Sequence, residues 1–454
     1  MAIASVNPAT GATVRRFKAT TASQIDRALT TAQRAFLTWR ERSFAERGAL
    51  MQRAAAILRE RRRHYAALMS LEMGKPITQA VAEVEKSAVA CEYFAEHASR
   101  FLADECGQTE ARLSVVHCEP LGAVLAVMPW NFPFWQVFRF AAPGLMAGNV
   151  GVLKHASNVP QCALAIEEVF QLAGFPKGVF RTLLIESRAV ESIIRDDRIA
   201  AVTLTGSEAA GIQVATAAGG ALKKVVLELG GADPFLVLRD ADLPRACVVA
   251  AQARVINSGQ SCIAAKRFIV ERSIAQGFLA GFVEHMRALR VGDPMDETTQ
   301  VGPLARGDLR DELVRQVRTS QRRGARLRVG GRALSGPGFF YEPTILDRVR
   351  PGMPAYDEEI FGPVASVMVA RDEAEAIRIA NDSRFGLGAS VWGADVDRCH
   401  AIARRLETGT VYINDFVKSD PRLPFGGVKK SGHGRELGVY GIKEFVNIKT
   451  VVAP

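Results

Sequence analysis

Apolar residues follow two different spacings along this chain, and the spacing changes near residue 108. Between residues 22 and 100 they recur every three or four positions, which predicts helices, including one long amphipathic run over 44–72. Residues 111–128 then change to strand-like character. Beyond them, short apolar runs alternate with helical segments, as in GVLKHA, PQCALAIEEVFQLAG, IAAVTLTG and VVLELGG. This alternation is typical of a doubly wound, parallel α/β sheet.

A second α/β series begins after residue 231. It opens with a helix predicted over 243–256 and continues with the strand KRFIV, a helix that ends near residue 289 and the apolar run FGPVASVMVA. We therefore predict two α/β domains that meet near residues 230–231. The strand-like segment 108–120 and the C-terminal residues fit neither series.

The composition is that of a folded globular protein. Of 454 residues, 48% are hydrophobic and 23% are charged, which excludes disorder over the whole chain. The formal net charge is +10. A chain of this length carries such an excess easily, so we expect no nucleic-acid partner.

The sequence lacks the features that are typical of membrane, secreted and metal-binding proteins. The first residues, MAIASVNPATG, resemble no signal peptide, and the most apolar stretch, 121–130, is half the roughly 20 residues that a membrane span needs. The seven cysteines include no CxxC pair, which favours a reducing compartment. There is no HExxH motif, and the Gly74-Lys75 pair runs into a proline rather than forming a P-loop. We therefore expect a cytoplasmic protein without a metal.

Two residues at the ends of apolar segments could carry acid–base or nucleophilic chemistry. Cys262, in NSGQSCIAAKR, lies on a polar loop before a strand, where a thiol has the access that a nucleophile needs. A structural thiol is the alternative. Glu228 ends the strand of VVLELGG, at the edge where α/β sheets bind ligands, and partial burial there suits a general base. A glutamate that caps the following turn is the alternative.

Two further segments could bind anions. Asn131, in PWNFPFWQVFRF, precedes a proline that can occupy the first turn of a helix, and its amide could donate to an oxyanion or simply cap that helix. The segment Thr205-Gly206-Ser207 links a strand to a helix, with Ser207 suited to the N-cap. An ordinary capped helix and a pyrophosphate site are both compatible with it.

Six motifs occur in one order along the whole chain: PWNFP, LTGS, LELGG, GQSC, EEIFGP and PFGGVKKSGHGRE. In this order, and with 34 positions from Glu228 to Cys262, the sequence resembles the aldehyde dehydrogenase superfamily. The segments LKHASN, LTGSEAAG and GQSCIAAKRF look like its bacterial NAD(P)-dependent succinate-semialdehyde dehydrogenase branch.

The resemblance implies a fold and an assembly. The expected fold is α/β, with a Rossmann-like cofactor domain over 1–107 and 121–230 and an α/β catalytic domain over 231–430. Strands in 108–120 and 431–454 would form a small β oligomerisation domain that pairs across subunits. We therefore expect a homodimer or homotetramer.

It also implies roles for individual residues. Cys262 would attack the aldehyde, Asn131 would stabilise the oxyanion, and Glu228 would activate the water that hydrolyses the thioester. Lys154 would bind the adenosine ribose, and Glu359 the nicotinamide ribose unless it forms only a surface ion pair. The remaining residues expected in the cofactor cleft are Trp130, Gly206, Ser207 and Phe361.

The residue at position 157 bears on the choice of cofactor. Relatives strict for NAD usually carry Glu three residues after the lysine that matches Lys154, whereas this chain has Ser157. A carboxylate would repel the 2′-phosphate of NADP, and a hydroxyl can donate to it. We predict that NADP is preferred and NAD also accepted. Ser157 could instead only cap the helix that begins near Pro160.

Two residues suggest a substrate with a carboxylate at its far end. Arg139 lies among aromatic residues, where a buried cation is costly unless an anion meets it. The resemblance places Arg139 and Ser419 at substrate positions, and succinate semialdehyde is the predicted substrate. An acidic side chain across the subunit could pair with Arg139 instead. A broad-specificity dehydrogenase for other short aldehydes is the alternative function.

Overall fold

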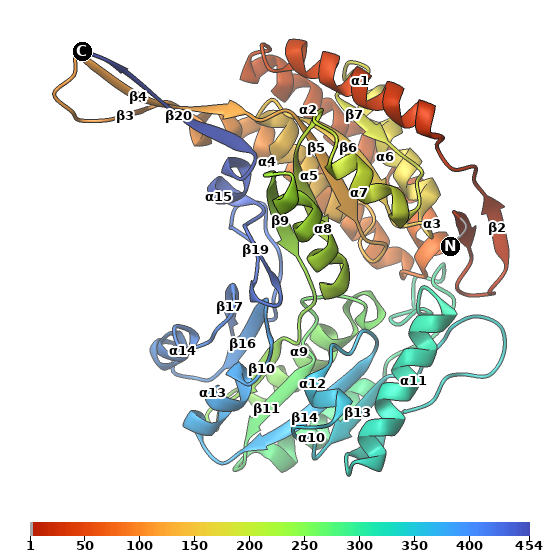
Figure 1. The fold of residues 1–454 in the computed structure, drawn as a ribbon. Helices are drawn as coiled ribbons and strands as arrows, with labels where there is room; N and C mark the ends of the chain where they lie inside the picture. Colours follow the sequence, from red (N-terminus) through yellow and green to blue (C-terminus); the bar gives the residue numbers. More distant parts are fainter. Residues whose placement is uncertain (1–2) are drawn as a thin grey trace.

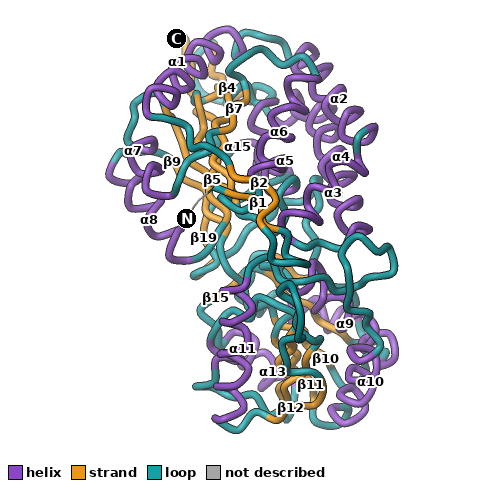
Figure 2. The backbone as a smooth tube through the Cα atoms, turned by 90° about the vertical axis from the view of Figure 1, so that its right-hand side faces the viewer, coloured by secondary structure: helices purple, strands orange, loops and turns teal. Residues whose placement is uncertain are grey.

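The computed structural model describes residues 3–454 and contains two large sheets, each with helices on both faces (Figures 1 and 2). Four helices precede the first sheet. The apolar run over 44–72, predicted as one helix, is divided at Arg61, which leaves helical geometry with φ −101° and ψ 17°. The four helices are α1 (Ala22–Trp39), α2 (Phe44–Glu60), α3 (Arg62–Met73) and α4 (Ile77–Phe101).

The first sheet has the strand order β19-β9-β8-β5-β6-β7 and is parallel except for β19. Figure 2 shows α2, α3 and α4 on one side of it and α7 and α8 on the other. Its strands are β5 (Ala123–Met128), β6 (Val150–His155), β7 (Phe180–Thr182), β8 (Ile199–Thr205), β9 (Lys224–Glu228) and β19 (Gly432–His433). The helices that follow them are α5 (Trp135–Met146), α6 (Pro160–Leu172), α7 (Val190–Ile194) and α8 (Glu208–Gly220).

The carboxyl ends of this sheet collect the predicted site residues. Asn131 follows β5, and Lys154 is the penultimate residue of β6. Gly206 follows β8, and Glu228 is the last residue of β9. Because parallel strands end at the same edge, residues far apart in the sequence meet there. The doubly wound pattern predicted from apolar periodicity is confirmed.

The second sheet has the order β12-β13-β14-β11-β10-β16-β17, with only the β12–β13 pair antiparallel. Its strands are β10 (Pro234–Val237), β11 (Arg267–Glu271), β12 (Arg326–Val329), β13 (Thr344–Asp347), β14 (Val364–Ala370), β16 (Gly388–Trp392) and β17 (Thr410–Ile413). Its helices are α9 (Leu243–Val255), α10 (Ala275–Arg287), α11 (Gly307–Arg322), α12 (Pro354–Asp357), α13 (Glu373–Asn381) and α14 (Val396–Ala403).

A small antiparallel sheet projects away from the body and carries the C-terminus (Figure 1). It has the order β20-β4-β3, and β4 (Leu113–Pro120) pairs with β20 (Val446–Ala453) along all eight residues. Two boundaries differ from the predicted ones. β3 (Glu105–Cys106) already belongs to this sheet, and β19 joins the first sheet instead, because residues 432–433 pair with β9.

The remaining elements are short. They are β1 (Ala4–Val6), β2 (Thr13–Arg16), β15 (Phe385–Gly386), β18 (Val428–Lys429) and α15 (Gly438–Lys443), with 3-10 turns at Ser187–Ala189 and Ile256–Gly259. Across residues 3–454, no helix is both long and apolar enough to cross a membrane.

Candidate active site

Cys262 lies on a tightly folded loop between α9 and β11. Asn257, Ser258 and Gly259 have φ values of 53°, 56° and 77°, three left-handed residues in succession. A Cβ at Gly259 would come within 2.3 Å of the backbone carbonyl carbon of Gly362, so only glycine allows this approach. Left-handed geometry at non-glycine residues costs on the order of 1–3 kcal/mol each, so the surrounding contacts must impose it.

Side chains from other elements hold this loop. The backbone N–H of Asn257 donates to Oε1 of Gln79 (2.7 Å), and its Nδ2 donates to the carbonyl of Asn131 (2.6 Å). Ser258 accepts a hydrogen bond at Oγ from the backbone N–H of Gly302 (2.9 Å). The loop that carries Cys262 is therefore fixed to both α4 and the segment after β5.

Asn131 is hydrogen-bonded to the same loop. Its Nδ2 donates to the carbonyl of Gln260 at 3.1 Å, and the side chain is almost fully buried. The structure does not make Asn131 the cap of α5, because that helix begins at Trp135 and Glu83 accepts the N–H groups of Phe134 (2.9 Å) and Trp135 (3.0 Å). An amide has two N–H donors, so Asn131 retains one for a developing oxyanion.

The Cys262 thiol is protonated at rest. Burial raises its pKa to about 12, and nearby Glu359 and Asp233 also raise it, while Arg139 and Lys266 lower it. Since the thiolate is the nucleophile, the reaction must supply either a base or additional positive charge.

Glu228 has the environment of a general base. It is 2% exposed, and among the described residues neither of its carboxylate oxygens has a hydrogen-bond partner, so it does not cap a turn. Burial and the charge of Glu436 raise its pKa well above the ordinary value, and Arg139 and Arg435 act in the opposite direction. A desolvated carboxylate of raised pKa accepts a proton readily near neutral pH.

Arg139 has a partner within its own chain. Its guanidinium forms an ion pair with Glu436, donates to Oγ1 of Thr205 (3.2 Å) and lies 4.8 Å from the centroid of the Phe425 ring. From the sequence we expected this charge to meet either a substrate carboxylate or an acidic side chain across the subunit. Glu436 already meets it, so Arg139 could reach a substrate only by giving up that ion pair.

Lys154 and Ser157 form a site that suits an anionic or hydroxylated ligand. Lys154 is buried, burial lowers its pKa, and within residues 3–454 no carboxylate is in ion-pair distance of it. Ser157 lies in the turn before α6, but Val159 is the N-cap, and it is the carboxylate of Glu72 that accepts the backbone N–H groups of Gln161 (3.0 Å) and Cys162 (2.9 Å) in the first turn of that helix. A buried ammonium without a counter-charge fits the ribose or phosphate of a dinucleotide.

The other predicted cofactor residues lie after strands of the first sheet, except Phe361, whose ring meets that of Trp130. Ser207 is the N-cap of α8, as predicted, and accepts the backbone N–H of Ala210 (3.4 Å). A Cβ at Gly206 would meet no atom closer than 3.6 Å, so the space above it is open. The rings of Trp130 and Phe361 are perpendicular, with centroids 5.8 Å apart.

Glu359 is half-buried, with 23% of its side chain exposed. Its Oε1 accepts the backbone N–H of Gly231 (3.0 Å) and lies 3.8 Å from Nζ of Lys266. Burial raises the pKa of Glu359, and Lys266 and Arg254 lower it. The ion pair considered from the sequence is therefore made with a buried lysine, and the role of Glu359 toward the ribose stays a prediction.

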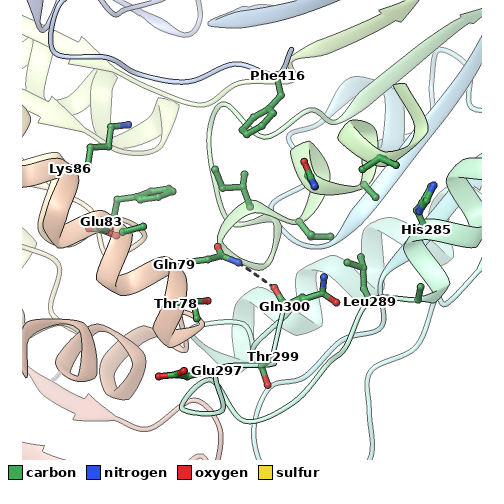
Figure 3. Close-up of a pocket in the computed structure, with 18 of the residues that line it drawn as sticks. Thr78, Gln79, Glu83, Lys86, His285, Leu289, Glu297, Thr299, Gln300 and Phe416 are labelled. Atoms are coloured by element: carbon green, nitrogen blue, oxygen red, sulfur yellow. Dashed lines mark hydrogen bonds between the residues drawn. The ribbon is translucent and has the colours of Figure 1, made fainter. Parts of the chain in front are cut away.

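A cavity of about 630 Å³ adjoins the segment that carries Asn131 (Figure 3). Ser419 lies behind two of the lining residues, because its Oγ accepts hydrogen bonds from Nζ of Lys86 (2.7 Å) and Nε1 of Trp135 (3.0 Å). Lys86 was not among the residues predicted from the sequence, because its position in a long amphipathic helix gives no sign of a site. The residues that line the cavity include Gln79, Lys86, Phe132, Trp135, Ile256 and Phe416.

Comparison with known proteins gives concordant matches. Residues 1–451 match the Aldehyde dehydrogenase family. A probable succinate-semialdehyde dehydrogenase [NADP(+)] of Synechocystis sp. is 55% identical over 99% of both chains, and succinate-semialdehyde dehydrogenase [NADP(+)] 1 of Mycobacterium tuberculosis is 51% identical over 99% of both. The crystal structure of succinic semialdehyde dehydrogenase from Streptococcus pyogenes, in complex with NADP+, matches with a TM-score of 0.98 and 37% identity over 100% of both chains.

Proposed function

Because this chain belongs to the aldehyde dehydrogenase family, we propose that it oxidises succinate semialdehyde to succinate with NADP as the preferred cofactor. The observation that carries the catalytic part is the hydrogen bond from Asn131 to Gln260, which holds an amide donor beside the loop of Cys262. The substrate and cofactor are supported by relatives of 51–55% identity that are named for this reaction.

The first step is the attack of the Cys262 thiolate on the aldehyde carbon. Positive charge from Arg139 and Lys266 favours the thiolate, although burial opposes it. The oxygen of the resulting thiohemiacetal becomes anionic. Asn131 Nδ2 and the backbone N–H of Cys262 are the donors that stabilise it.

The cofactor is assigned to the edge of the first sheet, in a domain formed by 1–107 and 121–230. Lys154 and Ser157 would bind the adenosine ribose and its 2′-phosphate, and Glu359 the nicotinamide ribose. When bound, NADP accepts the two electrons that leave the aldehyde carbon. Trp130, Gly206, Ser207 and Phe361 would complete this site, and the contact between the rings of Trp130 and Phe361 supports their assignment to one place.

The last step is hydrolysis of the thioester on Cys262. Glu228 takes a proton from water, which then attacks the thioester carbonyl, and succinate leaves as the thiol is restored. The charges of Arg139 and Glu436 act on the pKa of Glu228 in opposite directions, so this ion pair sets the fraction of base available.

We also propose a homo-oligomer, a dimer or a tetramer, assembled through the projecting sheet. Two strands and a two-residue third strand are marginally stable alone. The outer edge of β20 is unpaired in this chain, and Ile448 (63% exposed) and Val452 (56%) lie on one face of it. A second subunit would cover both the edge and the apolar side chains.

A reducing compartment such as the cytoplasm suits this chemistry. All seven cysteines are free thiols, and Cys262 must remain reduced to act as the nucleophile.

The test is steady-state kinetics of the purified full-length chain. NADPH formation is followed with succinate semialdehyde, butanal, hexanal and benzaldehyde, and NADH formation with NAD. We expect the highest kcat/KM for succinate semialdehyde with NADP. Comparable efficiency on the apolar aldehydes would instead favour the broad-specificity alternative.

A further inference from the structure

Lys86 is the cation on the cavity wall that has no carboxylate partner among residues 3–454. It extends from α4, on the face of that helix that also presents Glu83 and Gln79 to the cavity (Figure 3). The neighbouring carboxylates are already engaged. Glu83 pairs with Lys75 and accepts two backbone N–H groups, and Asp420 forms a bidentate pair with Arg422.

The groups around Lys86 are hydrogen-bond donors. Ser419 Oγ accepts from both Lys86 and Trp135, which uses its lone pairs and leaves its own O–H to be donated. The ammonium gives one N–H to Ser419 and lies 4.2 Å from the centroid of the Trp135 ring, and it has three N–H groups in total. Lys86 and Ser419 therefore offer donors and positive charge beside the cavity, and the neighbouring carboxylate of Glu83 is already engaged with Lys75 and two backbone N–H groups.

We infer that Lys86, together with the hydroxyl of Ser419, binds the far carboxylate of the aldehyde substrate and so determines specificity for acidic aldehydes. The inference rests on the proposed function, which it deepens by naming the group that recognises the substrate. A carboxylate has the oxygen lone pairs that the ammonium and the hydroxyl need. The aldehyde end would then lie toward Asn131, because Phe132 and Trp135 line the cavity beside that segment.

Burial explains why an anion is needed at this position. Burial and the charge of Arg139 together lower the pKa of Lys86 to about 7, so the site favours the ammonium less than water does. An anion placed against it restores the charged form. Arg139 does not compete for this role as the structure stands, because Glu436 satisfies its charge.

The experiment compares two aldehydes of equal length in the full-length enzyme with NADP. Succinate semialdehyde and butanal differ only in carboxylate against methyl at the far carbon. Lys86→Met retains length and removes the charge. We expect its kcat/KM for succinate semialdehyde to fall about 10- to 100-fold, mainly through KM, and that for butanal to change less than about 3-fold.

Three further variants complete the design. Lys86→Arg should recover a large part of the efficiency on succinate semialdehyde, and Ser419→Ala should lose a smaller factor in the same direction. Lys18→Met, which removes an exposed lysine outside the site, should leave kcat/KM for both aldehydes unchanged. If Lys86→Met is inactive on butanal as well, Lys86→Gln and Ser419→Ala replace it as the variants that are compared with the wild type.

The two levels of the proposal fail in different ways. A wild type that does not favour succinate semialdehyde over butanal overturns the proposed function itself. If the wild type has that preference, but kcat/KM of the Lys86 variants falls equally for both aldehydes or for neither, only the role of Lys86 is overturned.

Discussion

The guanidinium of Arg139 and the carboxylate of Glu436 form an ion pair in which the side chains are only 2% and 4% exposed. The pair lies close enough to Glu228 that both charges act on its pKa, Arg139 lowering it and Glu436 raising it. Since a general base must be deprotonated, the two substitutions that break this pair should have opposite effects on catalysis.

Arg139→Met should move the rising limb of the kcat–pH profile to higher pH, because Glu228 loses the cation that lowers its pKa. Glu436→Gln should move the same limb to lower pH. Both profiles are measured under conditions in which thioester hydrolysis limits turnover. Shifts in the same direction would contradict this account, and a loss confined to succinate semialdehyde, with butanal unaffected, would place Arg139 at the substrate carboxylate.

Removing the nucleophile or the base should block different half-reactions. Cys262→Ala should lower turnover by at least about 10³-fold and leave NADP binding intact, as followed by quenching of tryptophan fluorescence. Glu228→Gln should lower steady-state kcat by about 10²- to 10⁴-fold but retain a burst of NADPH, because the oxidation needs no water. Near-normal turnover in either variant would exclude the corresponding role.

A carboxylate at position 157 should change the choice of cofactor. Ser157→Glu places a negative charge near Lys154 and against a 2′-phosphate, so the ratio of kcat/KM for NADP to that for NAD should fall by about 10- to 10³-fold. Ser157→Ala serves as the matched control and should lower the ratio less. If the wild type uses NAD as well as NADP, the proposed preference is wrong.

The pH dependence of substrate preference should follow Lys86. Its pKa of about 7 is lowered by burial, Arg139 and Lys75 and raised by Glu83 and Asp420, so the ammonium is lost as the pH rises through 7. The ratio of kcat/KM for succinate semialdehyde to that for butanal should therefore fall about tenfold between pH 6 and pH 8. Taking the ratio removes the titration of the thiol and the base, which act on both aldehydes.

Lys86→Arg is the control for that measurement. A guanidinium remains charged throughout this range, so the ratio should become independent of pH. A wild-type ratio that is constant from pH 6 to pH 8 would count against the low pKa, and an unchanged slope in the arginine variant would assign the titration to another group.

Charged residues on the exposed face of β20 should disrupt assembly. Ile448→Glu combined with Val452→Glu places two carboxylates on the face that we propose to be covered, and should yield a smaller species in analytical ultracentrifugation. Asn447→Asp, on the opposite face of the strand, should leave the assembly unchanged. A wild type that sediments as a monomer would remove the basis for this proposal.

The sequence by itself determined the elements and the family of the protein. Apolar periodicity is a local property, so the alternating strands and helices of the first sheet, and α9, β11, α10 and β14 of the second, could be predicted. The division at Arg61, the short strands β3 and β19, and the elements α11, β12, β13, β16 and β17 are not evident from it. The motifs that contain Asn131, Glu228 and Cys262 are also local, because each depends on a turn or a strand end of a few residues. These could be recognised before any coordinates were known.

Only the tertiary structure decided which charges meet. Lys86 and Ser419 are 333 positions apart, and Glu436 reaches Arg139 from a segment that joins the first sheet after the whole second domain. Glu83, rather than Asn131, caps α5 for the same reason. Whether a buried cation is free or paired depends on long-range packing, because desolvation and ion pairing arise only when distant segments exclude water together.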